Sequence, residues 1–91
     1  MNKSELITEV ADRSGISKKE TEITLNATLE AIADALRQGE KIQLVGFGVF
    51  EVKNRAARTG RNPKTKEPIN IPASRTPQFK AGKTLKEIVN I

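Results

Sequence analysis

The chain has 91 residues, carries 16 Lys and Arg against 11 Asp and Glu, and contains neither histidine nor cysteine. Without these side chains the usual neutral-pH proton shuttle, thiol nucleophile, disulfide and zinc sites are excluded, so the sequence predicts no enzyme, no metal and no cofactor. Its apolar runs are too short for a transmembrane helix or a signal peptide, so we expect a cytoplasmic protein with no membrane partner.

The positive charge is concentrated in the second half of the chain. Residues 1–52 hold six Lys or Arg against nine Asp or Glu, a net charge of −3. Residues 53–86 hold ten Lys or Arg against Glu67 alone, a net charge of +9. A surface that is merely solvated usually intersperses both signs. This asymmetry therefore predicts a polyanionic partner.

Two amphipathic helices are predicted within the first 40 residues. Asn2 and Ser17 each stand three residues before a glutamate, which is the pattern of a capping box, and Gly15 and Gly39 end the two segments. A helix of about 20 residues is about 30 Å long, longer than half of such a small domain needs for its own core. We therefore expect a second copy of the chain to share the apolar stripe of the second helix, formed by Leu25, Leu29, Ile32 and Leu36.

The rest of the chain is predicted to form short strands and one final helix. Residues 42–44 and 49–52 flank a glycine turn and alternate as a hairpin, and residues 69–72 and 75–80 are again extended. The fold class is thus α+β in a single domain, residues 1–91. Its expected parts are a helical dimerisation half at 1–40, a sheet at 41–81 with an arm at about 53–75, and a C-terminal helix at 82–91. The expected core and dimer positions are Leu6, Leu25, Leu29, Ile32, Leu36, Leu44, Phe47, Phe50 and Phe79.

The arm contains a stretch, TGRNPKTKEP at residues 59–68, that has no aliphatic residue and cannot join a core. Asn62 and Pro63 give it turn chemistry. An isolated two-stranded hairpin is marginal in water, so we expect the tip to be mobile until it meets a surface. A two-stranded ribbon fits a DNA groove, and the lack of Tyr and Trp argues against single strands. The predicted partner is therefore double-stranded DNA.

Composition alone leaves two questions open. Pro63 fits an apolar wedge that enters a base step and kinks the duplex as well as it fits a simple turn. A small RNA-binding or ribosome-associated protein fits the same basic composition. A helix-turn-helix DNA reader fits less well, because the second helix is acidic.

The segment GFGVFEVKNRAARTGRNPKTKEPINIPA, residues 46–73, resembles the bacterial HU family of nucleoid DNA-binding proteins, relatives of integration host factor. The resemblance extends over the whole chain, from MNKSELI to FKAGKTLKEIV. It implies an intertwined homodimer with a helical body, a three-stranded β-saddle per subunit and protruding β-hairpin arms. It also implies a histone-like protein of the bacterial nucleoid that binds DNA with little sequence specificity, prefers bent, nicked or gapped duplexes, and bends them by intercalating Pro63. A site-preferring subunit of the integration-host-factor type is the alternative.

The resemblance also implies a set of DNA-binding residues on the arm, on the saddle and at the helix starts. They are Lys3, Lys53, Arg55, Arg58, Arg61, Asn62, Pro63, Lys64, Lys66, Arg75, Lys80, Lys83 and Lys86. Two positions depart from the pattern. Many relatives have aspartate where this chain has Asn26, and the family commonly has glycine where this chain has Lys66. A left-handed backbone there costs a lysine about 1 kcal/mol, so we expect the tip turn to differ from that of relatives.

Overall fold

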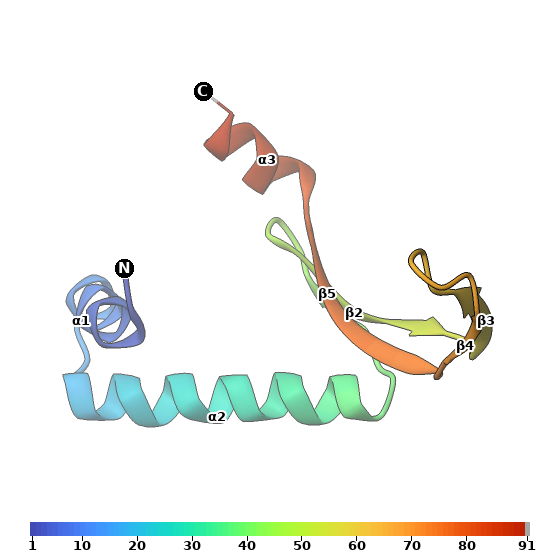
Figure 1. Cartoon of the computed structure of the whole chain (residues 1–91). Helices are drawn as coiled ribbons and strands as arrows, with labels where there is room; N and C mark the ends of the chain where they lie inside the picture. Colours follow the sequence, from blue (N-terminus) through green and yellow to red (C-terminus); the bar gives the residue numbers. More distant parts are fainter. Residues whose placement is uncertain (91) are drawn as a thin grey trace. The chain divides into compact units, whose positions relative to one another are not determined.

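The computed structural model describes residues 1–90 as an α+β chain of three helices and five strands (Figure 1). The elements are α1 (Lys3–Ser14), α2 (Lys18–Arg37), β1 (Ile42–Leu44), β2 (Gly48–Arg55), β3 (Arg58–Arg61), β4 (Pro68–Ile71), β5 (Ser74–Ala81) and α3 (Lys83–Val89). None of the helices described is long and apolar enough to cross a membrane. The chain divides into two compact units, Met1–Ala35 and Leu36–Ile91. The expected division into functional parts at residues 40 and 81 stays a prediction.

Both long helices begin where the sequence pattern places their caps. The Asn2 side-chain oxygen accepts the Glu5 N–H at 2.8 Å, and the Ser17 hydroxyl accepts the Glu20 N–H at 3.1 Å. These side chains replace partners that the first helical turn cannot find within the helix. Gly15 ends α1 with a φ of 77°, a left-handed angle that glycine adopts without strain.

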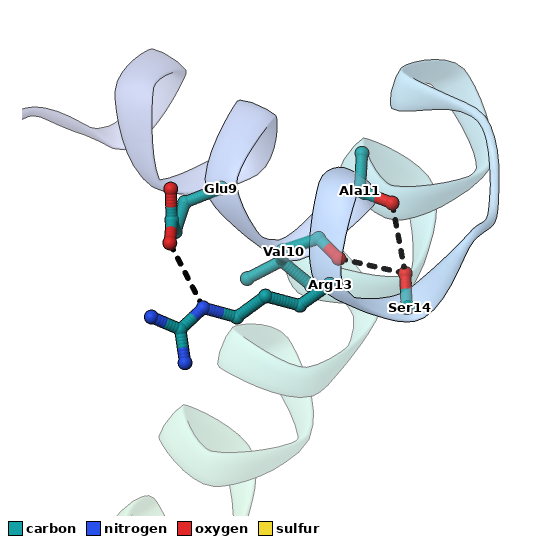
Figure 2. Close-up of polar contacts among 5 residues, drawn as sticks. All are labelled: Glu9, Val10, Ala11, Arg13 and Ser14. Atoms are coloured by element: carbon teal, nitrogen blue, oxygen red, sulfur yellow. Dashed lines mark hydrogen bonds and ion pairs between the residues drawn. The ribbon is translucent and has the colours of Figure 1, made fainter.

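The last turn of α1 carries short-range polar contacts (Figure 2). Arg13 Nε donates to Glu9 Oε1 at 2.8 Å, and the Ser14 hydroxyl donates to the carbonyls of Val10 at 2.7 Å and Ala11 at 3.4 Å. An exposed ion pair at this spacing contributes only about 0.3–0.5 kcal/mol. These contacts therefore shape the helix end and do not hold the fold together.

Few side chains are buried in the single chain. Among the described residues, Ala11 is the buried apolar side chain and Thr21 the buried polar one. Of the nine expected core positions, five are between 40% and 48% exposed (Leu6, Leu29, Leu44, Phe47 and Phe79), and four are half-buried (Leu25, Ile32, Leu36 and Phe50). The single chain thus leaves its apolar stripe open to a second surface.

The three-stranded sheet that the sequence predicts is present, with the antiparallel order β1-β2-β5. The β2 and β5 strands are longer than the predicted segments, and their register runs from Gly48 opposite Ala81 to Arg55 opposite Ser74. Gly48 is required at the start of β2, because a Cβ there would lie 2.6 Å from the Phe79 ring. The two strands pair over eight residues and form the base from which the arm continues.

Three phenylalanines, all predicted core positions, pack together on this sheet. Phe79 contacts Phe50 with ring centroids 4.8 Å apart and Phe47 with centroids 5.5 Å apart. Both pairs are tilted, and such contacts add about 0.5–1.5 kcal/mol each beyond the burial of area. The rings therefore pack against one another, although Phe47 and Phe79 stay 47% and 42% exposed in the single chain.

Candidate nucleic-acid interface

The cationic segment forms a two-stranded arm beyond the sheet (Figure 1). The β3 and β4 strands pair antiparallel, with Arg58 opposite Ile71 and Arg61 opposite Pro68. Two residues on each side, 56–57 and 72–73, separate this ladder from the β2–β5 ladder. Because the two spacers are equal in length, the arm keeps the register of the sheet. Pro72 lies in the gap, where it has no N–H to donate to a ladder.

Five cations of the arm and its base are exposed: Arg55 at the end of β2, Arg58 and Arg61 on β3, and Lys64 and Lys66 at the tip. Side chains of a strand alternate between its two faces, so the spacing of three between Arg58 and Arg61 in β3 places them on opposite faces. The ribbon therefore carries positive charge on both sides.

The tip is a closed turn, and Lys66 adopts the left-handed conformation within it. Lys66 has a φ of 59°, the one positive φ of a non-glycine residue in the described chain. Its N–H donates to the Asn62 carbonyl at 2.7 Å, and the Asn62 N–H donates to the Glu67 carbonyl at 2.9 Å. The lysine therefore does not remove the left-handed geometry from the turn, and its strain is retained.

Asn62 accepts a further hydrogen bond within the turn. The Lys64 N–H donates to its side-chain oxygen at 2.9 Å, so this oxygen is already engaged within the arm. Pro63, between the two residues, is exposed at the tip.

On the sheet, the predicted saddle cation Lys80 is held by a carboxylate that sequence reasoning missed. Lys80 Nζ lies 2.9 Å from Glu51 Oε1, and Lys41 Nζ lies 3.8 Å from Glu51 Oε2. The Glu51 side chain is only 18% exposed. The Lys80 hydrogen bond, with the positive charges of both lysines, holds the pKa of Glu51 below its ordinary value and outweighs the opposing effect of desolvation. No sequence spacing signals this cluster, because cross-strand pairing creates it.

Arg75, the second predicted saddle cation, also has a structural partner. Its guanidinium donates to the Arg37 carbonyl at 3.0 Å and to the Leu36 carbonyl at 3.3 Å. These are carbonyls of the last turn of α2, where a cation is favourable. Arg75 thus helps to end a helix 38 residues earlier in the chain.

The remaining predicted contacts, Lys3, Lys53, Lys83 and Lys86, are all exposed. Lys53 lies on β2 opposite Thr76, and Lys83 and Lys86 lie on α3. Lys3 begins α1, in the other compact unit. Contact of these four lysines with DNA stays a prediction.

Comparisons of the sequence and of the structure with known proteins both find bacterial DNA-binding proteins. The family "Bacterial DNA-binding protein" matches residues 1–90. The chain is 59% identical to the DNA-binding protein HU of Clostridium pasteurianum, with 99% of both chains covered. It is 56% identical to the HU protein of Geobacillus stearothermophilus, covering 98% of this chain and 99% of that one.

Solved structures of HU proteins are also similar to this chain. The Anabaena HU–DNA cocrystal structure matches with a TM-score of 0.85 and 50% identity, covering 98% of this chain and 97% of that one. HU from Thermotoga maritima matches with a TM-score of 0.69 and 40% identity, with 98% of both chains covered.

Replacing Lys66 with glycine is expected to stabilise the tip turn relative to replacing it with alanine. Both changes remove the same charge, but only glycine adopts the left-handed backbone without a cost of about 1 kcal/mol. The protection of the Asn62 N–H against hydrogen exchange should therefore be about fivefold higher in the glycine variant. Equal protection in both variants would show that residue 66 is not left-handed in solution.

Glu51 is expected to make stability depend on pH. Its pKa is lowered on folding, so its contribution is complete above about pH 4.3, the ordinary pKa of glutamate, and is lost as the pH falls through the lower folded value. The free energy of unfolding of the wild type should exceed that of Glu51→Gln most at neutral pH, with a gap that closes on acidification. NMR titration should show the pKa of Glu51 rising in Lys80→Met. A gap that does not vary with pH contradicts this assignment.

Proposed function

The chain belongs to the bacterial DNA-binding protein family and is a histone-like architectural protein that binds double-stranded DNA with little sequence specificity, and we propose that its β3–β4 arm grips the duplex. One observation carries this proposal: the arm presents four exposed cations on a two-stranded ribbon, and Arg55 adds a fifth at its base. Its function is thus architectural rather than catalytic, and its expected place is the cytoplasmic nucleoid.

The distribution of charge on the arm suits a groove. A ribbon two strands wide can enter a DNA groove, whose walls are lined by phosphates on both sides. Arg58 and Arg61 point to opposite faces of β3, so one ribbon can reach both walls. Contacts of this kind position the protein and carry little sequence information. This supports general binding over the site-preferring alternative.

The form that binds DNA is a homodimer. In a single chain, Ile23 is 60% and Leu29 48% exposed on α2. Burying this apolar surface against a second copy removes it from water and so stabilises the dimer. A dimer also carries two arms, which can hold a duplex from two sides. The homodimer is the assembly that the resemblance to HU implies.

Pro63 is the residue proposed to kink the duplex. It is exposed at the far end of the arm, beside Lys64. Its ring is therefore accessible to a DNA duplex. An apolar side chain inserted between base steps unstacks them and bends the duplex by about 20–90°. A DNA that is already bent, nicked or gapped lowers the cost of deformation and should be preferred.

Binding should be strongly sensitive to salt. If about six to ten phosphates are neutralised per dimer, the slope of log affinity against log salt is about −5 to −9. We expect this slope from titrations of a short duplex at several salt concentrations. Arg61→Gln should make the slope shallower by about one for each phosphate contact it removes. A flat response to salt would falsify the electrostatic account.

Replacing Pro63 with alanine should reduce bending more than binding. The expected loss is about 20° or more per arm, measured by energy transfer between dyes at the ends of a short duplex at low salt. Pro68→Ala is the matched control, because Pro68 lies in the same arm but in β4 rather than at the tip. The same loss of bending in both variants would assign the effect to the arm as a whole and not to a wedge at its tip.

A further inference from the structure

Asn62 is turned inward at the arm tip. From Arg61 to Asn70 it is the one residue that is not exposed. Its N–H donates to the Glu67 carbonyl at 2.9 Å, its carbonyl accepts the Lys66 N–H at 2.7 Å, and its side-chain oxygen accepts the Lys64 N–H at 2.9 Å. Three hydrogen bonds of the tip therefore meet on a single residue.

The side-chain hydrogen bond spans Pro63. Asparagine commonly bonds to the backbone two residues further on, which fixes a turn. Here the residue before Pro63 holds the N–H of the residue after it. The pyrrolidine ring already fixes φ of Pro63, and the position of the Lys64 N–H depends on ψ of Pro63. With both angles restrained, the ring has a set direction on the arm before any DNA is present.

The other contacts of the tip close the same turn. Lys66, with its left-handed φ of 59°, turns the chain back so that its N–H reaches the Asn62 carbonyl. The Thr65 hydroxyl accepts the Glu67 N–H at 3.4 Å, a longer and weaker contact. Among these groups, only the Asn62 side chain bridges the residues on either side of Pro63.

We propose that Asn62 is a positioning residue, whose side-chain oxygen orients Pro63 for entry into a base step, and that Asn62 does not act through a direct contact of its own with DNA. The inference rests on the proposed wedge function of Pro63. Fixing a binding group in its bound geometry improves binding mainly by reducing the cost of ordering it. This function differs from the DNA contact that the sequence predicts for Asn62.

The test is a double-mutant cycle with Asn62→Ala, Pro63→Ala and the double variant, read as bending of a short duplex. Residues that act as one unit are not additive. Pro63→Ala should reduce bending, and Asn62→Ala should reproduce part of that loss. In the Pro63→Ala background, Asn62→Ala should have no further effect. Asn62→Ser should restore part of the bending, because a serine hydroxyl can accept the same N–H, though more weakly.

A second measurement follows the turn without DNA. Hydrogen exchange of the Lys64 N–H should be about fivefold faster in Asn62→Ala, since one hydrogen bond is worth about 1 kcal/mol, and intermediate in Asn62→Ser. Unchanged exchange would show that the bond is absent in solution and overturn the proposal. Circular dichroism confirms that each variant retains its fold.

The outcomes separate the two proposals. If Pro63→Ala reduces bending and Asn62→Ala does not, the positioning function is wrong and the wedge stands. If Asn62→Ala reduces bending equally in both backgrounds, Asn62 contacts DNA directly and the positioning function is again wrong. If Pro63→Ala leaves bending unchanged, the wedge is wrong and the positioning function is overturned with it.

Discussion

The constraint on which this structure depends is that ten like charges between residues 53 and 86 cannot be buried without partners. Removing an unpaired charge from water costs more free energy than the apolar burial of a small core contributes. The chain therefore places four of these cations on a thin ribbon that has no interior, and a fifth at its base. That ribbon is held by its backbone ladder, by its turn and by the small apolar surface that Ile69 and Ile71 place beside Gly60. The helices and the short sheet must supply the core, and the single chain does not complete it.

Among the described residues, two cations near the base of the arm, unlike those on the arm, have side-chain polar partners within the protein. Lys80 is paired with Glu51, and Arg75 is hydrogen-bonded to carbonyls at the end of α2. Lys80 and Arg75 thus have polar partners in the free protein, although both side chains are exposed, as those of the arm cations are. A phosphate that approached Lys80 would compete with the Glu51 carboxylate.

Local sequence signals predicted the elements of the fold well. The caps at Asn2 and Ser17 and the stop at Gly15 were predicted correctly, because each depends on residues within one turn. The strand segments follow from alternation, whereas their assembly into a three-stranded sheet was implied by the resemblance. Phe47, Phe50 and Phe79 were predicted as core positions, and the contacts between their rings are seen only in the structure. The arm was found from its lack of aliphatic residues. The DNA contacts and the mobility of the tip stay predictions.

The features that the sequence did not predict depend on long-range geometry or on a single backbone angle. The hydrogen bonds of Arg75 join residues 38 and 39 apart in the chain, and the Glu51 pair requires the register of two strands. Lys66 adopts a left-handed backbone although lysine disfavours it by about 1 kcal/mol. The hydrogen bonds that close the turn outweigh this cost. The backbone preference of a residue type reflects only local steric costs. It does not include the hydrogen bonds of a particular turn, which can offset those costs.

The equal spacers at 56–57 and 72–73 restrict how such an arm can change in length. One residue added to a single strand would put the two strands out of step and turn every later side chain of that strand to the opposite face. One residue added to each strand would keep the pairing but reverse the faces of the tip relative to the sheet. Only two residues per strand preserve both. An arm of this design lengthens or shortens in fixed steps of about 7 Å, the rise of two strand residues.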